Sequence, residues 1–493
     1  MRIGFDNDKY IAQQAEHIRS RIKQFGGKLY LEFGGKLFDD YHAARVLPGF
    51  EPDSKIRMLK SLIDDVEIIV AINANDIEKS KQRGDLGITY DDDLLRLMDI
   101  FRGMGFLVGS VVITHYASQP NADAFRKRLD SLGIKSHLHY PIAGYPYDID
   151  HIVSDEGYGK NEFVETSRPL VVVTAPGPGS GKMATCLSQL YHEHKRGVAA
   201  GYAKYETFPV WNLPLKHPVN IAYEAATVDL NDANIIDPFH LEAYGETTVN
   251  YNRDVEIFPV LKAMMERISG SSPYQSPTDM GVNMAGHAII DDEVVREAAC
   301  MEIVRRYFQT AVDVKRTGAG EEQLEKLELL MNQAGVNASL SPARSAALLK
   351  EEMTGRPAGA MVLPDGSVVT GKTSTLLGAA SSLMMNALKG VAGVADEIDV
   401  ISDDAIEPIC RLKTDRLHSK NPRLHSDETL IALSISSATD PLAAKLIEHV
   451  EDLRGCDAFF SVIISATDEK IYRTLGINVC CEPKYEQHRY YHK

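Results

Sequence analysis

Cysteine and long apolar runs are both scarce in this chain. Its 493 residues include only six cysteines, none in the C-x-x-C spacing of a zinc site, and the adjacent Cys480 and Cys481 are poorly placed to pair with each other. Reduced thiols in a cytoplasmic protein are therefore expected. No stretch approaches the length needed to cross a membrane, and the first residues lack the apolar core of a signal peptide, so no membrane association is expected.

Positive charge is also in short supply. Lys and Arg number 53 against 69 Asp and Glu, which gives a net charge of −16. Nucleic acids and anionic membranes bind basic surfaces, so neither is expected as a main partner, although a local basic pocket remains compatible with this balance. The content of 44% hydrophobic and 25% charged residues is ordinary for a globular protein. A chain of this length exceeds one hydrophobic core and predicts several domains.

Helix and strand patterns alternate over the first half of the chain. Strands are predicted at 28–33, 66–72, 106–114, 135–140 and 169–174, and helices at 10–25, 54–63, 91–103, 121–132 and 183–194. This alternation predicts an α/β fold, with a mostly parallel sheet covered by helices. Ligands of such sheets bind beyond the carboxyl ends of the strands. We therefore expect Gly34, Asn73 and Thr114 to share one edge with the loop after residue 174.

The second half of the chain predicts two further domains. Helices at 254–268, 291–312, 321–334 and 341–353 predict a helical domain. Strands at 367–370, 397–401, 429–434 and 458–464, with helices at 373–389 and 440–453, predict a smaller α/β domain. The expected division is an α/β domain at 1–252, a helical domain at 253–354 and the smaller α/β domain at 355–493.

Two stretches compete as a phosphate-binding loop, and each contains glycine followed by lysine. Residues 366–373 match the pattern G-x(4)-G-K-[ST] in full, but residues 367–370 have the composition of a strand. Residues 169–182 depart from that pattern at Pro176 and Met183, yet a strand there leads through a glycine-rich turn into a helix. A phosphate cradle needs backbone N–H groups turned inward, which glycines between a strand and a helix provide. The irregular stretch is therefore predicted to be the anion site.

The predicted phosphate contacts come from both stretches. Lys182 stands just before a helix start, where its ammonium and the helix dipole favour an anion. A nucleotide such as ATP with Mg²⁺ is the favoured ligand, although position 183 lacks the usual metal-binding hydroxyl. For Lys182, the alternative is a plain strand-to-helix turn with a solvated lysine. For Lys372, the alternative is a lysine exposed beside a helix cap at residue 373. The residues predicted to bind the cofactor are Gly177, Gly179, Ser180, Gly181 and Lys182, with Lys372 and Thr373 as a second contact.

Candidate acid–base groups lie in residues 234–244. Asp237 and His240 stand three residues apart beside Glu242, and a histidine with a carboxylate is a common proton-transfer pair. Their spacing is not a zinc signature, and neither H-E-x-x-H nor G-x-S-x-G occurs in the chain. No metal ligand is assigned and zinc is not predicted. Ordinary hydrogen-bonded loop side chains remain the alternative.

Two other stretches are candidates for substrate contacts. Residues 411–426 concentrate positive charge and contain Arg-Leu-His-Ser twice, with Pro422 breaking any helix, so a loop is predicted. This basic loop suits two roles equally well: binding an anionic group of a substrate, or providing solubility or a subunit contact. The only tryptophan, Trp211, follows Lys204 and Glu206, and the stretch suits either the wall of a pocket for a planar or sugar-like ligand or a packed amphipathic strand. The residues predicted to bind a carboxylate or phosphate of the substrate are Arg416, His418, Arg423 and His425.

Four stretches resemble an uncharacterised family of bacterial cytoplasmic proteins of about this length. They are residues 31–37, 175–182, 236–244 and 369–374, and the match runs along essentially the whole chain. The resemblance implies a multi-domain α/β protein with a helical segment, and it transfers no catalytic residue. Some members of that family are called ATP-dependent zinc proteases. Of that label, only ATP has a matching feature here, the irregular glycine loop.

These observations predict an enzyme that binds a small phosphorylated or acidic ligand, with a nucleotide favoured, at residues 177–182. The expected reaction class is phosphoryl or related group transfer, as in a phosphotransferase or another nucleotide-dependent enzyme, with Lys182 holding phosphate and Asp237 or His240 handling protons. A non-catalytic sensor or scaffold that binds a small anion is the first alternative, and a metal-dependent hydrolase is the second. A cytoplasmic homo-oligomer is expected.

Overall fold

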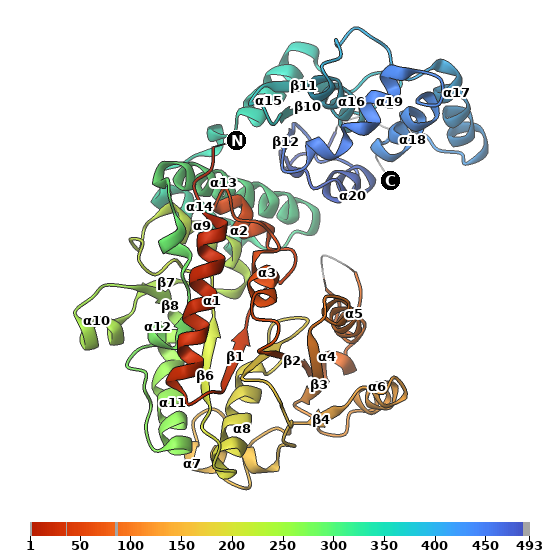
Figure 1. Cartoon of the computed structure of the whole chain (residues 1–493). Coiled ribbons are helices and arrows are strands. Elements are labelled where there is room, and N and C mark those ends of the chain that lie inside the picture. Colours follow the sequence, from red (N-terminus) through yellow and green to blue (C-terminus); the bar gives the residue numbers. More distant parts are fainter. Residues whose placement is uncertain (1, 36, 84–86, 487–493) are drawn as a thin grey trace. The chain divides into compact units, whose positions relative to one another are not determined.

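The computed structural model describes residues 2–35, 37–83 and 87–486 (Figure 1). The chain divides into two compact units, one of residues 3–299 and one that contains the chain from Cys300 onward. The boundaries predicted near residues 252 and 354 stay predictions. None of the helices in the described ranges is both long enough and apolar enough to span a membrane.

A parallel sheet forms the centre of the first unit. Its strand order is β4-β3-β2-β5-β1-β6-β9, and every neighbouring pair is parallel. The strands are β1 (Leu29–Phe33), β2 (Val66–Asn73), β3 (Leu107–Thr114), β4 (Ser136–Leu138), β5 (Leu170–Thr174), β6 (Gly201–Tyr205) and β9 (Gly281–Val282). The first five lie where the sequence pattern predicts strands, so the prediction of a parallel α/β fold is confirmed.

The fifth strand enters the sheet between the first two. β5 pairs with β2 on one side and with β1 on the other. The chain leaves β2 toward β3, but it leaves β5 in the opposite direction, toward β6. The crossovers after the two strands therefore cover opposite faces of the sheet. Ligands of open parallel sheets bind at such a reversal, beyond the carboxyl ends of the strands, and the glycine-rich loop follows β5 at this position.

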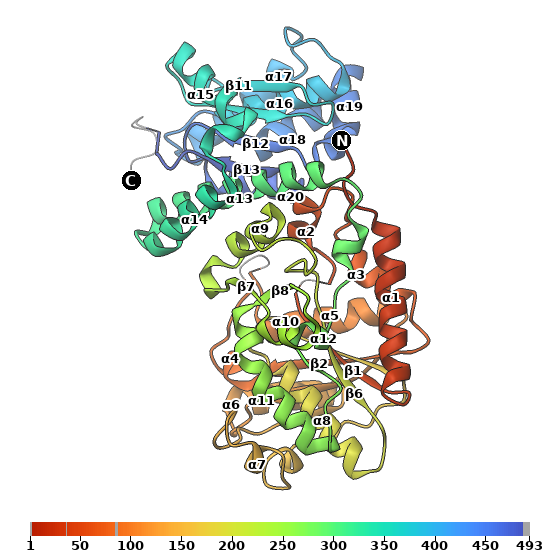
Figure 2. The same ribbon diagram turned by 90° about the vertical axis from the view of Figure 1, so that its left-hand side faces the viewer.

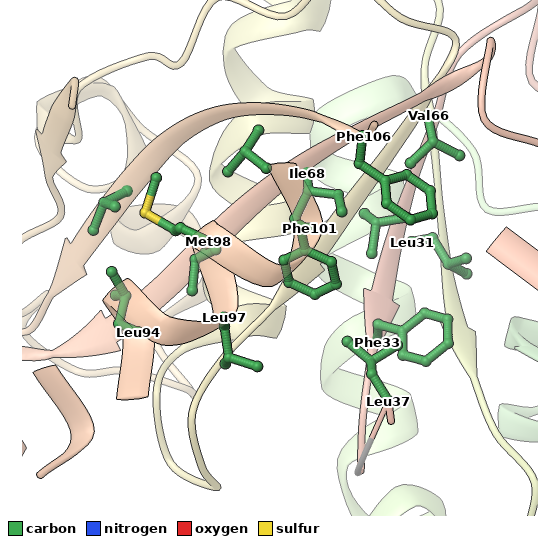
Figure 3. Close-up of a cluster of buried hydrophobic side chains, with 14 of the residues drawn as sticks. Leu31, Phe33, Leu37, Val66, Ile68, Leu94, Leu97, Met98, Phe101 and Phe106 are labelled. Atoms are coloured by element: carbon green, nitrogen blue, oxygen red, sulfur yellow. The ribbon is translucent and has the colours of Figure 1, made fainter. Parts of the chain in front are cut away.

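Helices cover both faces of this sheet. Its central strands are apolar at successive positions, so both faces must be buried. β2 is buried from Val66 to Ile72 and β5 along its whole length. On one face, α5 packs against β2 and β3, and Figure 3 shows side chains of α5, β1 and β2 in one apolar cluster. The helices on that face are α1 (Asn7–Gln24), α3 (Ser54–Lys60), α5 (Tyr90–Gly103) and α6 (Pro120–Ser131).

The opposite face carries α7 (Ile149–Ile152), α8 (Lys182–Lys195) and α11 (Asn252–Ser269). Tyr30 and Tyr202 point toward these helices, and so do residues of the same parity further along β1 and β6. Figures 1 and 2 show α8 and α11 side by side. The remaining elements of the unit are α2 (Tyr41–Val46), α4 (Ala74–Glu78), α9 (Pro218–Ala226), α10 (Pro238–Tyr244), α12 (Pro277–Met280), β7 (Asn234–Ile236) and β8 (Val249–Tyr251).

The second unit contains a smaller mixed sheet. Its order is β11-β10-β12-β13, with β10 antiparallel to both neighbours and β12 parallel to β13. The strands are β10 (Ala358–Val362), β11 (Val368–Lys372), β12 (Asp457–Phe460) and β13 (Asn478–Cys481). The helices are α13 (Asp292–Thr317), which begins in the first unit, α14 (Glu321–Ala334), α15 (Pro342–Thr354), α16 (Ala379–Ala392), α17 (Asp403–Arg411), α18 (Ser426–Ser436), α19 (Pro441–Glu448) and α20 (Ala466–Thr474).

Three local predictions for this unit are wrong. Residues 429–434, predicted as a strand, lie in α18, whose buried residues recur at the three- and four-residue spacing of a helix face. Residues 397–401 form no strand. The helix predicted from residue 373 begins only at Ala379, because residues 368–372 form a strand and residues 373–378 a turn.

Candidate functional site

The glycine-rich loop, residues 175–181, connects β5 to α8 at the reversal point of the sheet. Gly179 and Gly181 have φ angles of 72° and 81°, in the left-handed region that residues with a Cβ rarely adopt. At Gly177 a Cβ would collide with the Tyr90 hydroxyl, and at Gly181 it would lie 3.0 Å from Thr114. Glycine is therefore required here by both backbone conformation and close packing. The exposed Gly179 leaves the loop open to ligands.

Two side chains from neighbouring strand ends hold the loop by its carbonyl groups. Asn73 Nδ2 donates to the Gly179 carbonyl oxygen at 3.0 Å, and Thr114 Oγ1 donates to that of Ser180 at 2.8 Å. Asn73 ends β2 and Thr114 ends β3. The prediction that these two residues share an edge with the loop is confirmed. Their bonds fix the conformation of the loop while leaving its N–H groups unused.

Several N–H groups of the loop and of the following helix have no acceptor. Those of Gly177, Gly179 and Gly181, and of the first three residues of α8, donate to no group within the described residues. The Ser180 hydroxyl is buried and also lacks a partner there. Free donors at a helix start are expected from helix geometry, and they bind anions well because the helix dipole acts in the same sense. The orphaned Ser180 hydroxyl is a second donor for such a ligand.

Lys182, the first residue of α8, places a positive charge beside this loop. It is half-buried and makes no ion pair with the described residues. Burial raises the pKa of the Cys186 thiol well above its usual value; the negative charge of Glu32 adds to this, and the Lys182 ammonium opposes it. Glu32 and Lys182 thus both lie near Cys186, which connects the loop to a group of charged residues on β1 and β6.

That group lies on the same face of the sheet as α8 and α11. Glu32 and Lys204 are register partners on β1 and β6. Tyr202 donates its hydroxyl to Glu32 Oε2 at 2.7 Å. Lys204 Nζ lies 2.9 Å from Glu206 Oε1 and also forms an ion pair with Asp254, in the first turn of α11. Three carboxylates and one lysine therefore meet at the carboxyl edge of the sheet.

Burial and the neighbouring charges shift the pKa values of these groups in different directions. Burial raises the pKa of Glu206 to about 8; Lys204 partly opposes this shift and the charge of Asp254 adds to it. Burial also acts to raise the pKa of Asp254, but Lys204 outweighs it and holds that pKa below its usual value. Burial alone would lower the pKa of Lys204, yet Asp254, Glu206 and Glu32 together raise it. Near neutral pH the arrangement thus contains a protonated Glu206 beside a charged Lys204–Asp254 pair.

Trp211 lies beside Glu206 across Gly281 of β9. A Cβ at Gly281 would collide with the indole ring of Trp211, 2.5 Å away, and would lie 3.5 Å from Glu206 Oε2. The indole Nε1 is buried and has no partner among the described residues. Sequence reasoning raised Trp211, Lys204 and Glu206 as a possible pocket wall but missed Asp254. The usable signal was the alternation Tyr202, Lys204, Glu206, whereas Asp254 is distant in sequence.

Asp237 and His240 occupy another part of the first unit. Asp237 is fully buried and caps α10: its Oδ1 accepts from the N–H groups of Phe239 and His240, and its Oδ2 accepts from the Thr278 hydroxyl at 2.7 Å. His240 Nδ1 lies 2.9 Å from Ser276 Oγ. Their proton-transfer role stays a prediction. The carboxylate of Asp237 is occupied by structural hydrogen bonds.

The stretch that matches the phosphate-loop pattern lies in the second unit. Gly371 and Lys372 end β11, and the Thr373 N–H donates to the Pro357 carbonyl oxygen at 2.9 Å. A Cβ at Gly371 would collide with the backbone of Leu383 in α16. The glycine here permits close packing of a strand against a helix. Cofactor binding by Lys372 and Thr373 stays a prediction.

In the basic stretch at residues 411–426, some of the predicted substrate-binding side chains are exposed to solvent and others pair with residues of the same unit. Arg416 and His418 are exposed, whereas Arg423 lies 3.3 Å from Glu486. His425 Nδ1 lies 3.0 Å from Asp468 Oδ2, and this hydrogen bond raises the pKa of His425 despite partial burial. Substrate binding by these residues stays a prediction. Among the residues that the structure describes, no three His, Cys, Asp or Glu side chains are grouped as metal ligands would be.

The parallel sheet, with a glycine-rich loop at its reversal point, defines an α/β protein of the open-sheet class. The chain belongs to the DUF1846 family: residues 3–335 match the domain of unknown function DUF1846, N-terminal, and residues 339–491 match its C-terminal counterpart. The predicted membership of an uncharacterised bacterial family is confirmed.

Two bacterial relatives match this chain over nearly the full length of both proteins. The chain is 59% identical over 492 residues to a UPF0371 protein of Corynebacterium diphtheriae, covering 100% of this chain and 99% of the relative. It is 57% identical over 490 residues to a UPF0371 protein of Streptococcus pneumoniae serotype 19F, with 99% of each chain covered. These names state no activity.

Proposed function

We propose that the protein is an enzyme that binds a phosphorylated ligand, a nucleoside triphosphate first of all, at Gly177 to Lys182, and transfers a phosphoryl or related group from it. The observation that supports this most directly is the set of unused N–H groups around a loop whose carbonyls are already held by Asn73 and Thr114. A loop fixed in this way meets an anion without reorganisation, which favours binding and charge stabilisation during transfer.

Lys182 completes the proposed site with a full positive charge. Because the helix dipole and the ammonium act in the same direction, the phosphate oxygens gain charge-assisted hydrogen bonds there. The carboxyl groups of Glu206 and Asp254 favour an enzyme over a passive anion sensor, since acid–base groups with shifted pKa values beside a ligand loop are typical of reaction centres. Position 183 is a methionine, so a magnesium ion brought with the nucleotide would need a ligand other than the usual hydroxyl.

Titration calorimetry of the full chain with ATP and Mg²⁺ tests the proposal. Lys182→Ala is expected to weaken ATP binding by roughly 10- to 100-fold, the usual effect of removing a hydrogen bond to a charged group. The matched control is Lys195→Ala, which removes a lysine from the other end of α8, where Lys195 pairs with the exposed Asp155.

The control variant is expected to bind ATP as the wild type does. Equal ATP affinity in the wild type and Lys182→Ala would contradict the proposal, and so would the absence of ATP binding to the wild type. GTP and inorganic pyrophosphate serve as parallel probes, because the loop contacts phosphate oxygens that all three ligands share.

A further inference from the structure

Four charged residues lie beside the glycine-rich loop but outside the proposed phosphate contacts: Glu32, Lys204, Glu206 and Asp254. Glu206 follows β6 and the loop follows β5, with only β1 between these strands. Neighbouring strands lie about 4.8 Å apart, so the two strand ends are separated by roughly 10 Å. Lys182 begins α8 and Asp254 lies in the first turn of α11, and these helices pack against each other on one face of the sheet. A phosphate chain on the loop would therefore have its outer end near the charged group.

We infer that Glu32, Lys204, Glu206 and Asp254 form the acceptor half of the same site, which binds a neutral polyhydroxylated acceptor of the sugar or polyol class. This inference rests on the proposed function and extends it by naming the second substrate and the residue that takes its proton. Glu206 is that residue, because its carboxyl group is the most deeply buried of the two that pair with Lys204.

The chemistry of the group fits hydroxyl groups better than charged ones. Carboxylates accept hydrogen bonds from hydroxyls and the ammonium donates to them. Lys204 is outnumbered by three carboxyl groups, so an anionic acceptor would be repelled. Trp211 beside Glu206 adds an aromatic surface whose indole N–H has no partner in the part of the chain that the structure describes, a combination suited to the mixed apolar and polar faces of a sugar ring.

The transfer step balances with ATP and the acceptor as its two reactants. The acceptor oxygen attacks the terminal phosphorus and forms a new P–O bond with one of its lone pairs. The bond from that phosphorus to the bridging oxygen breaks, and its electron pair leaves with ADP, whose charge the loop N–H groups and Lys182 stabilise. The hydroxyl proton passes to the Glu206 carboxylate.

Glu206 must therefore be ionised at the start of each turnover, which makes the reaction pH-dependent. The groups that act on it are Lys204 on β6 and Asp254 on α11, and Glu32 on β1 acts on Lys204 in turn. Tyr223 on α9 and Tyr251 on β8 also interact with it. Ionisation near pH 8 predicts that turnover rises as the pH increases from 6 to 9.

The test measures ADP release from ATP and Mg²⁺ by the full chain, with glycerol, ribose, glucose and myo-inositol as acceptor probes, between pH 6 and 9. We expect at least one probe to raise ADP release above the rate with water alone. Glu206→Gln is expected to lower that stimulated rate by roughly 100-fold or more and to abolish its rise near pH 8, while ATP affinity stays within about twofold of the wild type.

Three results would overturn the inference, and the first two of them leave the proposed function standing. One is ATP binding that depends on Lys182 with no stimulation by any acceptor probe. The other is a Glu206→Gln variant that keeps the stimulated rate and its pH profile. A variant in which ATP affinity and thermal stability both fall would place Glu206 in the structure of the loop, which also overturns the acceptor assignment. Loss of the Lys182 effect itself would instead contradict the proposed function.

Discussion

The two stretches that contain glycine and lysine, at 175–182 and at 366–373, differ in what the chain does before and after the lysine. In the first, a buried strand ends at Thr174 and a helix begins at Lys182. In the second, the glycine and the lysine are themselves the last residues of β11, and the next helix begins seven residues later, at Ala379. In the part of the chain that the structure describes, the stretch that departs from the pattern is a loop with N–H groups that have no acceptor. The stretch that matches the pattern lies mostly in strand β11.

This difference shows that a phosphate-loop pattern depends on its flanking elements. Glycines separate strand from helix at Gly179 and Gly181, where positive φ angles turn the backbone. At Gly371 the same residue type has a different task, since it lets β11 approach the backbone of α16. The pattern alone cannot distinguish a glycine needed for conformation from a glycine needed for packing.

Gly371→Ala is the substitution expected to have the largest effect on this comparison. The added methyl group would overlap with the backbone of Leu383, which cannot move without displacing α16, so the second unit should lose roughly 3 kcal/mol of unfolding free energy. Chemical denaturation measures this loss. ATP affinity is expected to stay unchanged, and a selective loss of ATP binding without loss of stability would show that residue 371 belongs to a ligand site.

The paired substitutions Lys182→Ala and Lys372→Ala compare the two lysines directly. The first is expected to reduce ATP binding free energy by roughly 2 kcal/mol, because a charge-assisted contact is lost. The second is expected to change ATP affinity less than twofold, because Lys372 ends a strand and the following N–H is bonded to Pro357. Calorimetry on both variants decides the comparison, and equal effects would mean that both stretches contact the ligand.

The buried carboxyl group near the first stretch gives a pH-dependent prediction. The pKa of Glu206 is raised from 4.5 to about 8 in the folded state. Its contribution to stability is therefore present below pH 4.5 and is lost as the pH rises through 8. Compared with the wild type, Glu206→Gln should gain roughly 2 kcal/mol of unfolding free energy between pH 5 and pH 6.5, because each unit of pKa difference corresponds to about 1.4 kcal/mol. Urea denaturation at the two pH values measures this gain, and a difference that is independent of pH would show that Glu206 is ionised throughout.

Thr114→Val is expected to have the smallest effect. It removes the hydroxyl that donates to the Ser180 carbonyl, so the loop should lose about 1 kcal/mol of stabilisation and ATP affinity should fall several-fold. Calorimetry measures the affinity. Thr474→Val is the matched control, since it removes a threonine hydroxyl bonded to a carbonyl within α20 in the other unit. An unchanged affinity in Thr114→Val would show that the loop does not need this support.

The first unit could be predicted well because its signals are local. β5 is an apolar run up to Thr174, β2 is apolar from Ile68 to Ile72, and α5 repeats apolar residues at helical spacing, so their types follow from neighbouring residues alone. The second unit was predicted less well at residues 429–434. Its run of Thr, Leu, Ile and Ala suits a strand or a helix, and bonds made outside the run favour the helix: Glu428 accepts from the His425 N–H, and Asp468 accepts from that of Ser426.

The candidate site was predictable only in part. The loop and the edge residues Asn73 and Thr114 could be placed from the rule that parallel strands end at one edge. The insertion of β5 between β2 and β1, which brings the loop beside Glu32, has no local signal because it depends on which strands pair. Asp254 could not be assigned for the same reason, since its partner Lys204 lies 50 residues earlier in the chain.

The sequence by itself determined the class of the fold, the strands β1 to β5 of the large sheet, and a loop able to turn its N–H groups toward an anion. Those features depend on residue spacing and on backbone freedom over a few positions. The tertiary structure alone decided which strands are neighbours in the sheet and which charged residues stand beside the glycine-rich loop. Strand pairing and burial are interactions between distant segments, so they set the hydrogen-bond partners and the pKa values that no local pattern contains.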